Sequence, residues 1–368
     1  MVIAIDLTAL SYHMTGIERY AMCITEEMLK IDKENRYILI FRDKIYPTFI
    51  QYIDGEQVKT KIIHGNNKLL FYQLVLPKAL YTIKADQYLF FAFTSPILFS
   101  KKGIINTIHD MGPWDSGDSL KLLQKIYLKT TCYFSAKNSE KIITVSRFSR
   151  RRIAEILGFP KNRIRVIPSA VYERVIDLSQ EDDTVVKRKY KLPDKYIMSL
   201  STLEPRKNLN ILLEAYVSIM DKIDYDLVLV GRKGWKMDEI LKKYDAQERI
   251  HITGFVEDKD VAHIYKNALC FVFPSKYEGF GLPPVEALAL GTPVIASNAA
   301  SIPEVLMDRA TYFDYENVME LQELLKNLNS NIKKMSCHLN EYQKKNYRFD
   351  TSAKKVLEFI RDESINSK

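Results

Sequence analysis

Long apolar runs, paired cysteines and a leader-like N-terminus are all missing from this sequence. No stretch of about 18 uncharged apolar residues occurs, so no transmembrane helix is predicted. The first residues, MVIAID, lack the basic start, apolar stretch and cleavage site of a signal peptide. The four cysteines, Cys23, Cys132, Cys270 and Cys337, stand at neither metal-ligand nor redox spacing. Together these absences predict a cytoplasmic protein.

The composition is that of a folded protein with room for two domains. The chain has 368 residues, of which 46% are hydrophobic and 27% charged, so wholesale disorder is excluded. The formal net charge of +8 indicates an anionic partner. Nucleic acid, an acidic lipid surface and a phosphorylated small molecule all fit that description, and charge alone does not choose among them.

Short β-branched runs alternate with amphipathic helical patterns along both halves of the chain. The predicted strands of the first half are Val2–Asp6, Tyr37–Phe41, Tyr88–Phe91, Ile104–Ile108, Lys141–Val145 and Arg163–Ile167. Those of the second half are Tyr196–Ser201, Leu227–Val230, Ile250–Thr253, Cys270–Phe273 and Pro293–Ala296. Helical patterns between them include Glu18–Lys30, Leu69–Ile83 and Leu120–Lys137. This alternation predicts an α/β protein whose parallel sheets are covered by helices.

A polar segment divides the chain. Residues 176–192 carry a run of acidic residues and then Lys187, Arg188 and Lys189, with little apolar periodicity beforehand, and are predicted to be a linker. Residues 1–175 and 193–348 then form two Rossmann-like domains. The tail, 349–368, has apolar residues at helical spacing and is predicted to form a C-terminal helix.

The first chemical motif follows the predicted strand Cys270–Phe273. A loop with two glycines, Gly279 and Gly281, leads into Pro283 and Pro284, which suit the first positions of a helix. Gly291 provides a helix stop. Backbone N–H groups of such a loop, backed by a helix dipole, can approach an anion.

Two carboxylates accompany this loop. Glu286, expected in the first helical turn, can accept hydrogen bonds from a ribose diol, and Glu278 can hold the hydroxyls of a transferred sugar or face charge at its anomeric carbon. The plainer alternative is that Glu286 caps the helix and Glu278 is solvated. The glycines, the prolines and the strand-loop-helix context favour the functional interpretation.

The second motif is Ser201–Asn208, which follows another predicted strand. Arg206 and Lys207 stand at the carboxyl end of the strand, where a guanidinium and an ammonium can neutralise a diphosphate. Asn208 is expected to cap the following helix with its side chain. A solvated basic pair on a surface loop is the alternative.

These motifs together resemble glycosyltransferase family 4, which has the GT-B fold. Glu204–Asn208 and Glu278–Glu286 carry the likeness, and Thr15–Tyr20 is similar to the family's N-terminal glycine loop, although a single Gly16 stands where many members have two glycines. The run Glu-Pro-Arg-Lys-Asn is similar to bacterial mannosyltransferases of O-antigen assembly. The resemblance implies two Rossmann-like domains with parallel sheets facing across a cleft, and a C-terminal helix that crosses back to the N-terminal, acceptor-side domain.

The resemblance also implies an activity and a set of roles. The enzyme would be a retaining hexosyltransferase of polysaccharide biosynthesis, with mannose from GDP-mannose as first choice and glucose, N-acetylglucosamine and rhamnose open. The acceptor would be a saccharide, either polysaccharide or lipid-linked. His109 and Glu278 would be catalytic. Donor binding is expected from Gly16, Arg206, Lys207, Gly254, Phe255, Val256, Phe280, Gly281, Leu282 and Glu286, with Gly231–Lys233 as a further wall for the base.

No cofactor and no metal are expected. No Asp-x-Asp motif stands in a convincing loop, and the cations and a helix dipole can stabilise a leaving diphosphate. Two alternatives remain from other classes. A sugar-nucleotide epimerase can share the architecture, and the basic run Arg147–Arg152 is the one feature that suggests a nucleic-acid binder. No nucleic-acid-binding signature accompanies that run, so no nucleic-acid partner is expected.

The stretch 119–129 raises the question of a membrane partner. Lys121, Lys125 and Lys129 recur every four residues on one face of a predicted helix, with Leu122, Leu123, Ile126 and Tyr127 largely on the other side. An ordinary amphipathic helix would pack those apolar residues on its own domain. The functional alternative is peripheral contact of the lysines with anionic lipid at the inner face of the cell membrane.

Overall fold

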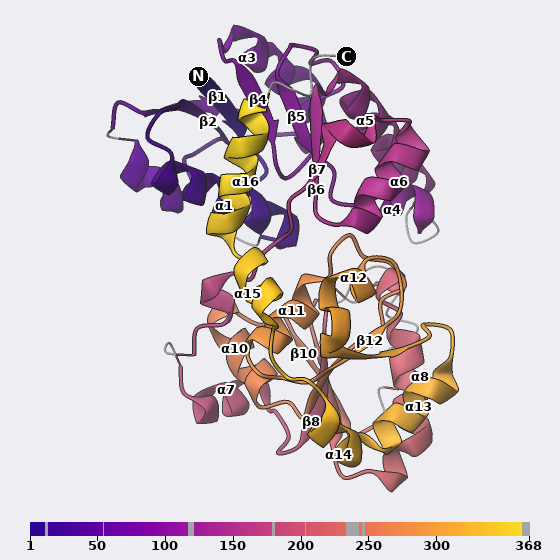
Figure 1. Ribbon diagram of the computed structural model, residues 1–368. Helices are drawn as coiled ribbons and strands as arrows, with labels where there is room; N and C mark the ends of the chain where they lie inside the picture. Colours follow the sequence, from indigo (N-terminus) through magenta and orange to yellow (C-terminus); the bar gives the residue numbers. More distant parts are fainter. Residues whose placement is uncertain are drawn as a thin grey trace. The chain divides into compact units, whose positions relative to one another are not determined.

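The computed structural model describes residues 1–11, 14–53, 55–116, 121–178, 181–202, 204–232, 243–244 and 247–362. The chain divides into two compact units, each built on its own parallel sheet (Figure 1). Unit 1 comprises Met1–Ala170 and Lys345–Lys368, and unit 2 comprises Val171–Lys344. Each unit is therefore described by itself.

Unit 1 contains a seven-stranded sheet in the order β3-β2-β1-β4-β5-β6-β7, in which every pairing is parallel. Its strands are β1 Val2–Asp6, β2 Arg36–Arg42, β3 Val58–Ile63, β4 Gln87–Phe90, β5 Ile104–Thr107, β6 Lys141–Thr144 and β7 Ile164–Val166. The central strands are almost wholly buried, as expected of a parallel sheet covered on both faces.

Most helices of unit 1 connect its strands, and one more, formed by the C-terminal segment of the chain, belongs to the same unit. They are α1 Gly16–Ile31, α2 Lys68–Leu70, α3 Leu76–Thr82, α4 Gly112–Asp115, α5 Leu122–Asn138, α6 Arg147–Leu157 and α16 Phe349–Arg361. Helix α16 packs against α1. The buried Lys141 of β6 donates from Nζ to the carbonyl oxygens of Phe359 at 2.9 Å and Asp362 at 2.8 Å. A cation at the carbonyl end of a helix is stabilised by the helix dipole, so Lys141 fixes the end of α16.

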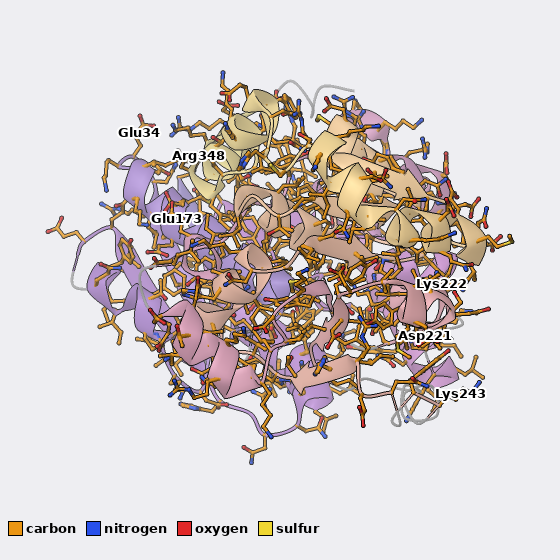
Figure 2. The ribbon with its side chains drawn as sticks, turned by 90° about the horizontal axis from the view of Figure 1, so that it is seen from below. Glu34, Glu173, Asp221, Lys222, Lys243 and Arg348 are labelled. Carbon is orange, nitrogen blue, oxygen red and sulfur yellow. The ribbon has the colours of Figure 1, made fainter. Side chains whose placement is uncertain are left out.

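Unit 2 contains a six-stranded parallel sheet in the order β10-β9-β8-β11-β12-β13. Its strands are β8 Tyr196–Leu200, β9 Asp226–Val230, β10 Ile250–Gly254, β11 Cys270–Phe273, β12 Val294–Ser297 and β13 Ala310–Phe313. Its helices are α7 Asp183–Tyr190, α8 Leu209–Ile219, α10 Asp258–Lys266, α11 Leu282–Ala289, α12 Ile302–Leu306, α13 Val318–Lys326 and α14 Leu328–Asn331, with α15 Glu341–Asn346 at its end. The buried face of α8 packs with α13 over β8, β9 and β11. The exposed Asp221 and Lys222, just beyond α8, extend away from this core (Figure 2).

The predicted α/β class and two parallel-sheet Rossmann-like domains are confirmed, and the predicted strands match observed ones to within a residue or two. Two strands, β3 and β13, were not predicted. Both lie at a sheet edge, where one side of the strand needs no apolar cover. In β3 the residues Lys59 and Lys61 replace the apolar run that marks a central strand.

Two local predictions differ from the structure. The segment 176–192, predicted as linker, contains helix α7, because Val186 is buried and the Lys189 and Tyr190 side chains both donate to Asp260 of α10 at 2.7 Å. In α5, packing of the apolar side on its own domain fails in the first turns: Leu122 is 71% exposed and Leu123 82% exposed. The helix is instead buried through its C-terminal half, at Thr131, Cys132, Ser135 and Ala136.

In both sheets the order of the strands reverses at one internal point. In unit 1 the chain runs outward from β1 through β2 to β3 and then returns to β4 on the other side of β1; in unit 2 it does the same from β8 and returns at β11. The loops after β1 and β4, and those after β8 and β11, therefore part to opposite sides of each sheet. In open α/β sheets this switch point, at the carboxyl ends of the strands, is where ligands bind.

Candidate active site

The loop after β8 forms a short 3-10 turn, Pro205–Lys207, which places Arg206 and Lys207 at the switch point of unit 2. Asn208 follows in the left-handed region, with φ 54°, and ends this turn. Its side chain does not cap α8, contrary to the prediction, but donates from Nδ2 to the Tyr315 carbonyl oxygen at 2.8 Å. A left-handed backbone points the side chain away from the first N–H groups of α8, and Asn tolerates this conformation better than most residues.

The loop after β11 has the predicted entry into a helix. Gly281 precedes α11 with φ +86°, a conformation that favours glycine, and Pro283 and Pro284 occupy early helical positions. Glu286 is the fifth residue of α11, beyond the first turn in which it was predicted. Its side chain is buried and accepts a hydrogen bond from the Tyr265 hydroxyl at 3.3 Å.

The two loops meet through their charged side chains. Lys207 Nζ donates to Glu278 Oε1 at 2.6 Å, and Arg206 Nη1 donates to Glu278 Oε2 at 3.3 Å. Arg206 also donates from Nη2 to Glu204 Oε1 at 2.9 Å and from Nη1 to the Tyr277 carbonyl oxygen at 2.8 Å. The predicted cations and the predicted sugar-binding carboxylate thus form one cluster.

Glu278 is ionised in this cluster despite its burial. The residue is 7% exposed, which excludes the solvated alternative. Burial raises the pKa of a carboxyl group, but the charges of Lys207 and Arg206 outweigh burial and lower the pKa of Glu278 below its ordinary value. A hydrogen bond from Ser301 Oγ to the Glu278 carbonyl oxygen, at 2.9 Å, holds the loop in place.

The predicted base wall lies at the end of β10, on the carboxyl edge of the same sheet. Gly254 has φ +72°, Val256 is buried and Phe255 is 49% exposed. The guanidinium of Arg232 lies 4.3 Å from the centroid of the Phe255 ring. An aromatic ring stacked by an arginine at a sheet edge is a platform on which a planar base can stack. Lys233, also predicted here, lies outside the described residues.

Two of the candidate glycines, Gly231 and Gly16, differ in whether the structure has room for a side chain at their position. A Cβ at Gly231, which has φ +137°, would lie 1.8 Å from the Ser201 carbonyl oxygen, so this glycine is required by the close approach of the two strand ends. A Cβ at Gly16, the first residue of α1, meets nothing within 4 Å. Packing therefore does not demand glycine at position 16, and the N-terminus of α1 is open there.

The candidate residues of unit 1 are Gly16, at the start of α1, and His109, just after β5. His109 Nε2 is 2.8 Å from the Phe91 carbonyl oxygen, which makes Nε2 the protonated nitrogen and leaves the lone pair on Nδ1. Burial lowers the pKa of His109, although the Phe91 carbonyl opposes the shift, so the ring is neutral at neutral pH. Tyr20, one turn after Gly16, meets the His109 ring edge-on with centroids 5.1 Å apart.

Two residues of interest were missed by sequence reasoning. Asp6, the last residue of β1, is 3% exposed and accepts from the Thr8 hydroxyl at 2.7 Å and from the Tyr72 hydroxyl at 3.3 Å. Glu204 was recognised only as part of a motif, yet it orients Arg206. An acidic residue at the carboxyl end of an otherwise apolar predicted strand is the signal that marks Asp6.

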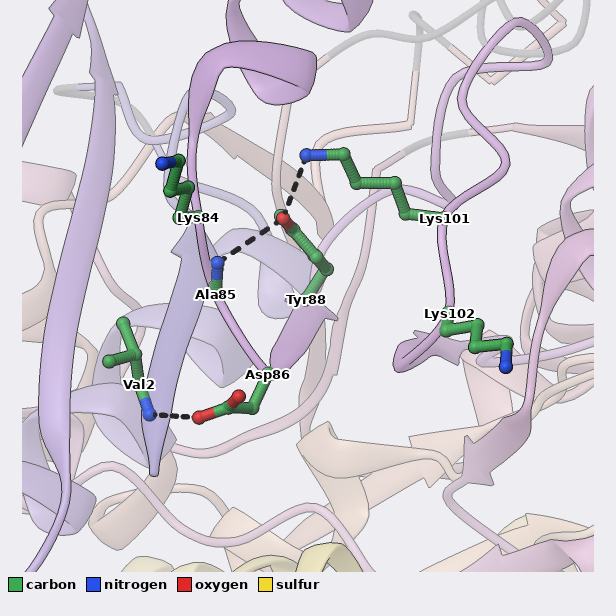
Figure 3. Close-up of a pocket in the computed structure, with 7 residues that line it drawn as sticks. All are labelled: Val2, Lys84, Ala85, Asp86, Tyr88, Lys101 and Lys102. Carbon is green, nitrogen blue, oxygen red and sulfur yellow. Dashed lines mark hydrogen bonds between the residues drawn. The ribbon is translucent and has the colours of Figure 1, made fainter.

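A surface pocket of about 460 Å³ lies at the opposite edge of the unit 1 sheet. Figure 3 shows its lining, which includes Val2, Asp86 and three lysines, with Asp86 accepting from the Val2 backbone at 2.7 Å. The ammonium group of Lys101 donates hydrogen bonds to the carbonyl oxygens of Tyr81 and Ile83. Because ligands of such sheets bind at the carboxyl edge, this pocket is not part of the candidate site.

Across the described ranges, no group of three or more His, Cys, Asp or Glu side chains is arranged to hold a metal ion. Over the same part of the chain, no helix combines the length and apolar character needed to cross a bilayer.

Two parallel sheets, each with loops at its switch point, define a protein of two Rossmann-like domains. Comparison with known proteins identifies the fold as GT-B. Residues 15–173 match the family described as Glycosyltransferase Family 4, and residues 181–346 match the family described as Glycosyl transferases group 1. HepE of Anabaena, solved in complex with UDP and glucose, superposes with a TM-score of 0.72 at 14% identity, over 98% of this chain and 99% of that one. The two units of the chain thus carry the domains of these two glycosyltransferase families, and the protein is a glycosyltransferase.

Relatives of this chain include O-antigen mannosyltransferases. The O-antigen chain mannosyltransferase B of Escherichia coli is 28% identical over 327 residues, which are 84% of this chain and 85% of that protein. The serotype-specific mannosyltransferase WbdA of Escherichia coli is 33% identical over 198 residues, or 51% of this chain. The matched segment spans 24% of WbdA, so that likeness concerns one part of a much longer protein.

Proposed function

We propose that this glycosyltransferase moves a hexose from a nucleotide diphosphate sugar to a saccharide acceptor of polysaccharide biosynthesis, with mannose from GDP-mannose as the first choice of donor. The observation that carries the proposal is the cluster of Arg206, Lys207 and Glu278 at the switch point of unit 2. It presents two cations for a diphosphate and a buried carboxylate for sugar hydroxyls. Relatives that are mannosyltransferases support the choice of sugar.

In this proposal unit 2 binds the donor. Lys207 binds the diphosphate, Glu278 accepts hydrogen bonds from the transferred sugar and Glu286 from the ribose. The backbone of Phe280, Gly281 and Leu282, at the start of α11, meets phosphate or sugar where the helix dipole favours negative charge. Gly254, Phe255 and Val256 form the wall for the base, with the exposed Phe255 ring as its stacking surface.

Unit 1 supplies the acceptor side. The open N-terminus of α1 at Gly16 allows close approach of a phosphate or sugar. The neutral His109 has an unprotonated Nδ1 that can accept a hydrogen bond from a sugar hydroxyl. Cations and a helix dipole can stabilise the leaving diphosphate electrostatically, so we propose transfer without a metal. Retention of the anomeric configuration is proposed from the resemblance to the family.

A donor screen tests this proposal. Purified protein is incubated with common sugar nucleotides, in excess EDTA, and release of the nucleoside diphosphate is measured with and without candidate saccharide acceptors. GDP-mannose is expected to be consumed fastest, and NMR of the product is expected to show the anomeric configuration of the donor. Activity that vanishes in EDTA and returns with Mg²⁺ or Mn²⁺ would overturn the metal-free account. A new sugar nucleotide formed without acceptor would indicate the epimerase alternative.

The acceptor is proposed to be lipid-linked, on the evidence of an exposed apolar surface in unit 1. Leu122, Leu123 and Ile126 at the start of α5 are 71%, 82% and 52% exposed, and Leu69 and Leu70 of α2 are 51% and 53% exposed. The two segments adjoin, because Gln73 donates to the Tyr127 hydroxyl at 3.1 Å. Apolar side chains accompanied by Lys121, Lys125 and Lys129 fit the interface of an anionic bilayer.

Vesicle cosedimentation tests this surface. The protein is expected to bind anionic vesicles in a salt-sensitive way and neutral vesicles weakly, and both the Leu122→Glu/Leu123→Glu variant and a triple lysine-to-glutamate variant should bind less. Met319→Glu is the matched control, since Met319 is a 76% exposed apolar residue of unit 2. Equal binding to neutral and anionic vesicles, or binding to neither, would contradict the proposal.

A further inference from the structure

The cation cluster of unit 2 has no net positive charge. Arg206 and Lys207 carry two positive charges, and Glu204 and Glu278 carry two negative charges, so the four side chains sum to zero. A diphosphate that enters this cluster meets cations that already have carboxylate partners. Binding is therefore an exchange of partners, in which the incoming anion must displace a carboxylate.

The two cations differ in how tightly they are held. Arg206 is tied to Glu204, to Glu278 and to the Tyr277 carbonyl oxygen, and its own carbonyl oxygen accepts from the Lys276 backbone N–H at 3.0 Å. Within the part of the chain that the structure describes, Lys207 Nζ has one hydrogen-bond partner, Glu278, and lies 5.7 Å from the centroid of the Phe273 ring. Lys207 can turn toward a phosphate at the cost of one partner, whereas Arg206 would give up as many as three.

The partner that Lys207 would leave behind is a buried carboxylate. The Glu278 side chain is only 10% exposed, so water does not readily replace the ammonium group. Arg206 Nη1, at 3.3 Å, would be the weaker cationic partner that remains. Loss of the closer partner from a buried charge is unfavourable, while hydroxyl groups that donate to the carboxylate restore its hydrogen bonds. A nucleotide sugar brings such hydroxyls together with its diphosphate. A bare nucleoside diphosphate brings only the anion.

We infer that Glu278 is a specificity-determining residue that makes this site favour the nucleotide sugar over the nucleoside diphosphate. The inference rests on the proposed function of the site. With the sugar bound, Glu278 exchanges Lys207 for sugar hydroxyls and the cation is free for the diphosphate. Once the sugar has left, Glu278 competes with the diphosphate for Lys207, which speeds release of the product. Specificity here is achieved by opposing the wrong ligand as well as by binding the right one.

Calorimetric titration with GDP and GDP-mannose tests the inference on the full chain. The wild-type protein is expected to bind GDP-mannose more tightly than GDP. In Glu278→Gln the cluster gains a net positive charge and loses the competing carboxylate, so GDP should bind about tenfold more tightly than in the wild type. GDP-mannose should gain nothing, because the charged hydrogen bonds from its sugar are lost, and the preference between the two ligands should disappear.

Glu204→Gln is the matched control. It gives the cluster the same change in net charge, but Glu204 is bound only to Arg206 among the cluster's cations and its side chain is 32% exposed. Both ligands should then bind somewhat more tightly, and their ratio should stay at the wild-type value. Glu278→Ala, checked for folding by thermal melting, provides a second removal of the charge in a smaller side chain.

The outcomes separate this inference from the proposed function. If the wild-type protein binds GDP-mannose but both Glu278 variants, correctly folded, bind GDP no more tightly than the wild type, the inference is wrong and the site remains a donor site. The inference is equally wrong if Glu204→Gln abolishes the preference as Glu278→Gln does, because bulk charge would then explain it. Failure of the wild-type protein to bind any nucleoside diphosphate or sugar nucleotide overturns the proposed function itself.

Discussion

Each of the two sheets has a buried carboxyl group at its switch point, and the pKa values of the two groups are shifted in opposite directions. Asp6 is the last residue of β1 and is 3% exposed, and Glu278 lies in the loop after β11 and is 7% exposed. Burial raises the pKa of Asp6 to about 6, against hydrogen bonds from Thr8 and Tyr72 that lower it. Burial acts on Glu278 in the same direction, but two cations reverse the outcome and lower its pKa.

The comparison shows that the neighbouring charges, and not burial, decide what each edge can bind. In unit 2 the cations and carboxylates stay charged and partnered, an arrangement suited to a charged ligand such as a diphosphate. In unit 1, among the described residues, the carboxyl group of Asp6 has hydroxyl and backbone partners but no cation, and the pKa of His109 is lowered. A neutral imidazole and a carboxyl group without a cationic partner offer hydrogen bonds rather than positive charge, which suits an uncharged ligand, as a saccharide acceptor would be. The sheets have the same topology but different chemistry at their switch points.

The largest expected effect follows from removing the cation that distinguishes the two edges. Lys207→Ala leaves Glu278 buried with a weaker partner, and it removes the cation that can turn to a phosphate. Losing a charge-assisted contact with the diphosphate costs up to about 3 kcal/mol, which corresponds to roughly a 100-fold fall in kcat/KM for the donor. Initial rates against donor concentration measure the change.

Lys276→Ala controls for charge in this experiment. Lys276 is an exposed lysine of the loop after β11, whose backbone N–H donates to the Arg206 carbonyl oxygen, and alanine retains this hydrogen bond. Its donor kinetics should stay near the wild-type values. Equal losses in the two variants would mean that long-range charge governs donor binding and that the contact of Lys207 with Glu278 is incidental.

A smaller effect is expected at Asp6. The raised pKa means that the folded protein binds a proton more tightly than the unfolded chain, so this contribution to stability is complete below the ordinary pKa of 3.8 and is lost as pH rises to about 6. Asp6→Asn does not titrate. Between pH 4 and pH 7 the stability of the wild type should fall relative to Asp6→Asn by about 2 kcal/mol, because a part of the effect of two pKa units is already lost at pH 4.

Urea unfolding at several pH values, followed by the fluorescence of Trp114, measures this difference. Trp235→Phe in both proteins removes the other tryptophan of the chain, so that the signal reports on unit 1. The comparison of the two proteins cancels the other titrating groups. Parallel stability curves from pH 4 to pH 7 would show that Asp6 is ionised in the fold, and the contrast with Glu278 would then disappear.

Sequence reasoning reached the architecture and motif positions, because central strands and helix-start residues leave strong local signals. The run Cys270–Phe273 is wholly buried as β11, and Pro283 and Pro284 open α11 as predicted. Sequence reasoning missed the edge strand β3, because its lysines interrupt the apolar run that marks a central strand. The roles given to Arg206, Lys207 and the other site residues remain predictions.

What the sequence could not give was the partner of each charge. Glu278 was considered either solvated or sugar-binding, and its bond to Lys207 spans 71 residues of chain, so no local pattern encodes it. The exposed Leu122 and Leu123 illustrate the same limit, because periodicity places apolar residues on one face of a helix without saying what covers that face. Asp6 appeared as the last residue of a strand, and only its burial shows how far its pKa is raised.

The smallest expected effect separates the two cations of the cluster. Sequence reasoning treats Arg206 and Lys207 alike, but the guanidinium of Arg206 joins the loop after β8 to the loop after β11 through Glu204, the Tyr277 carbonyl and Glu278. Arg206→Lys keeps the charge and loses the fork, so it should lower the stability of unit 2 by about 1–2 kcal/mol, the cost of one or two charged hydrogen bonds. Donor affinity should change by less than about threefold, or about 0.6 kcal/mol, because the positive charge is retained and only its position changes. Urea unfolding and donor titration of the same preparation measure both quantities. A variant of wild-type stability that has lost the donor would show that Arg206, and not Lys207, is the cation that meets the diphosphate.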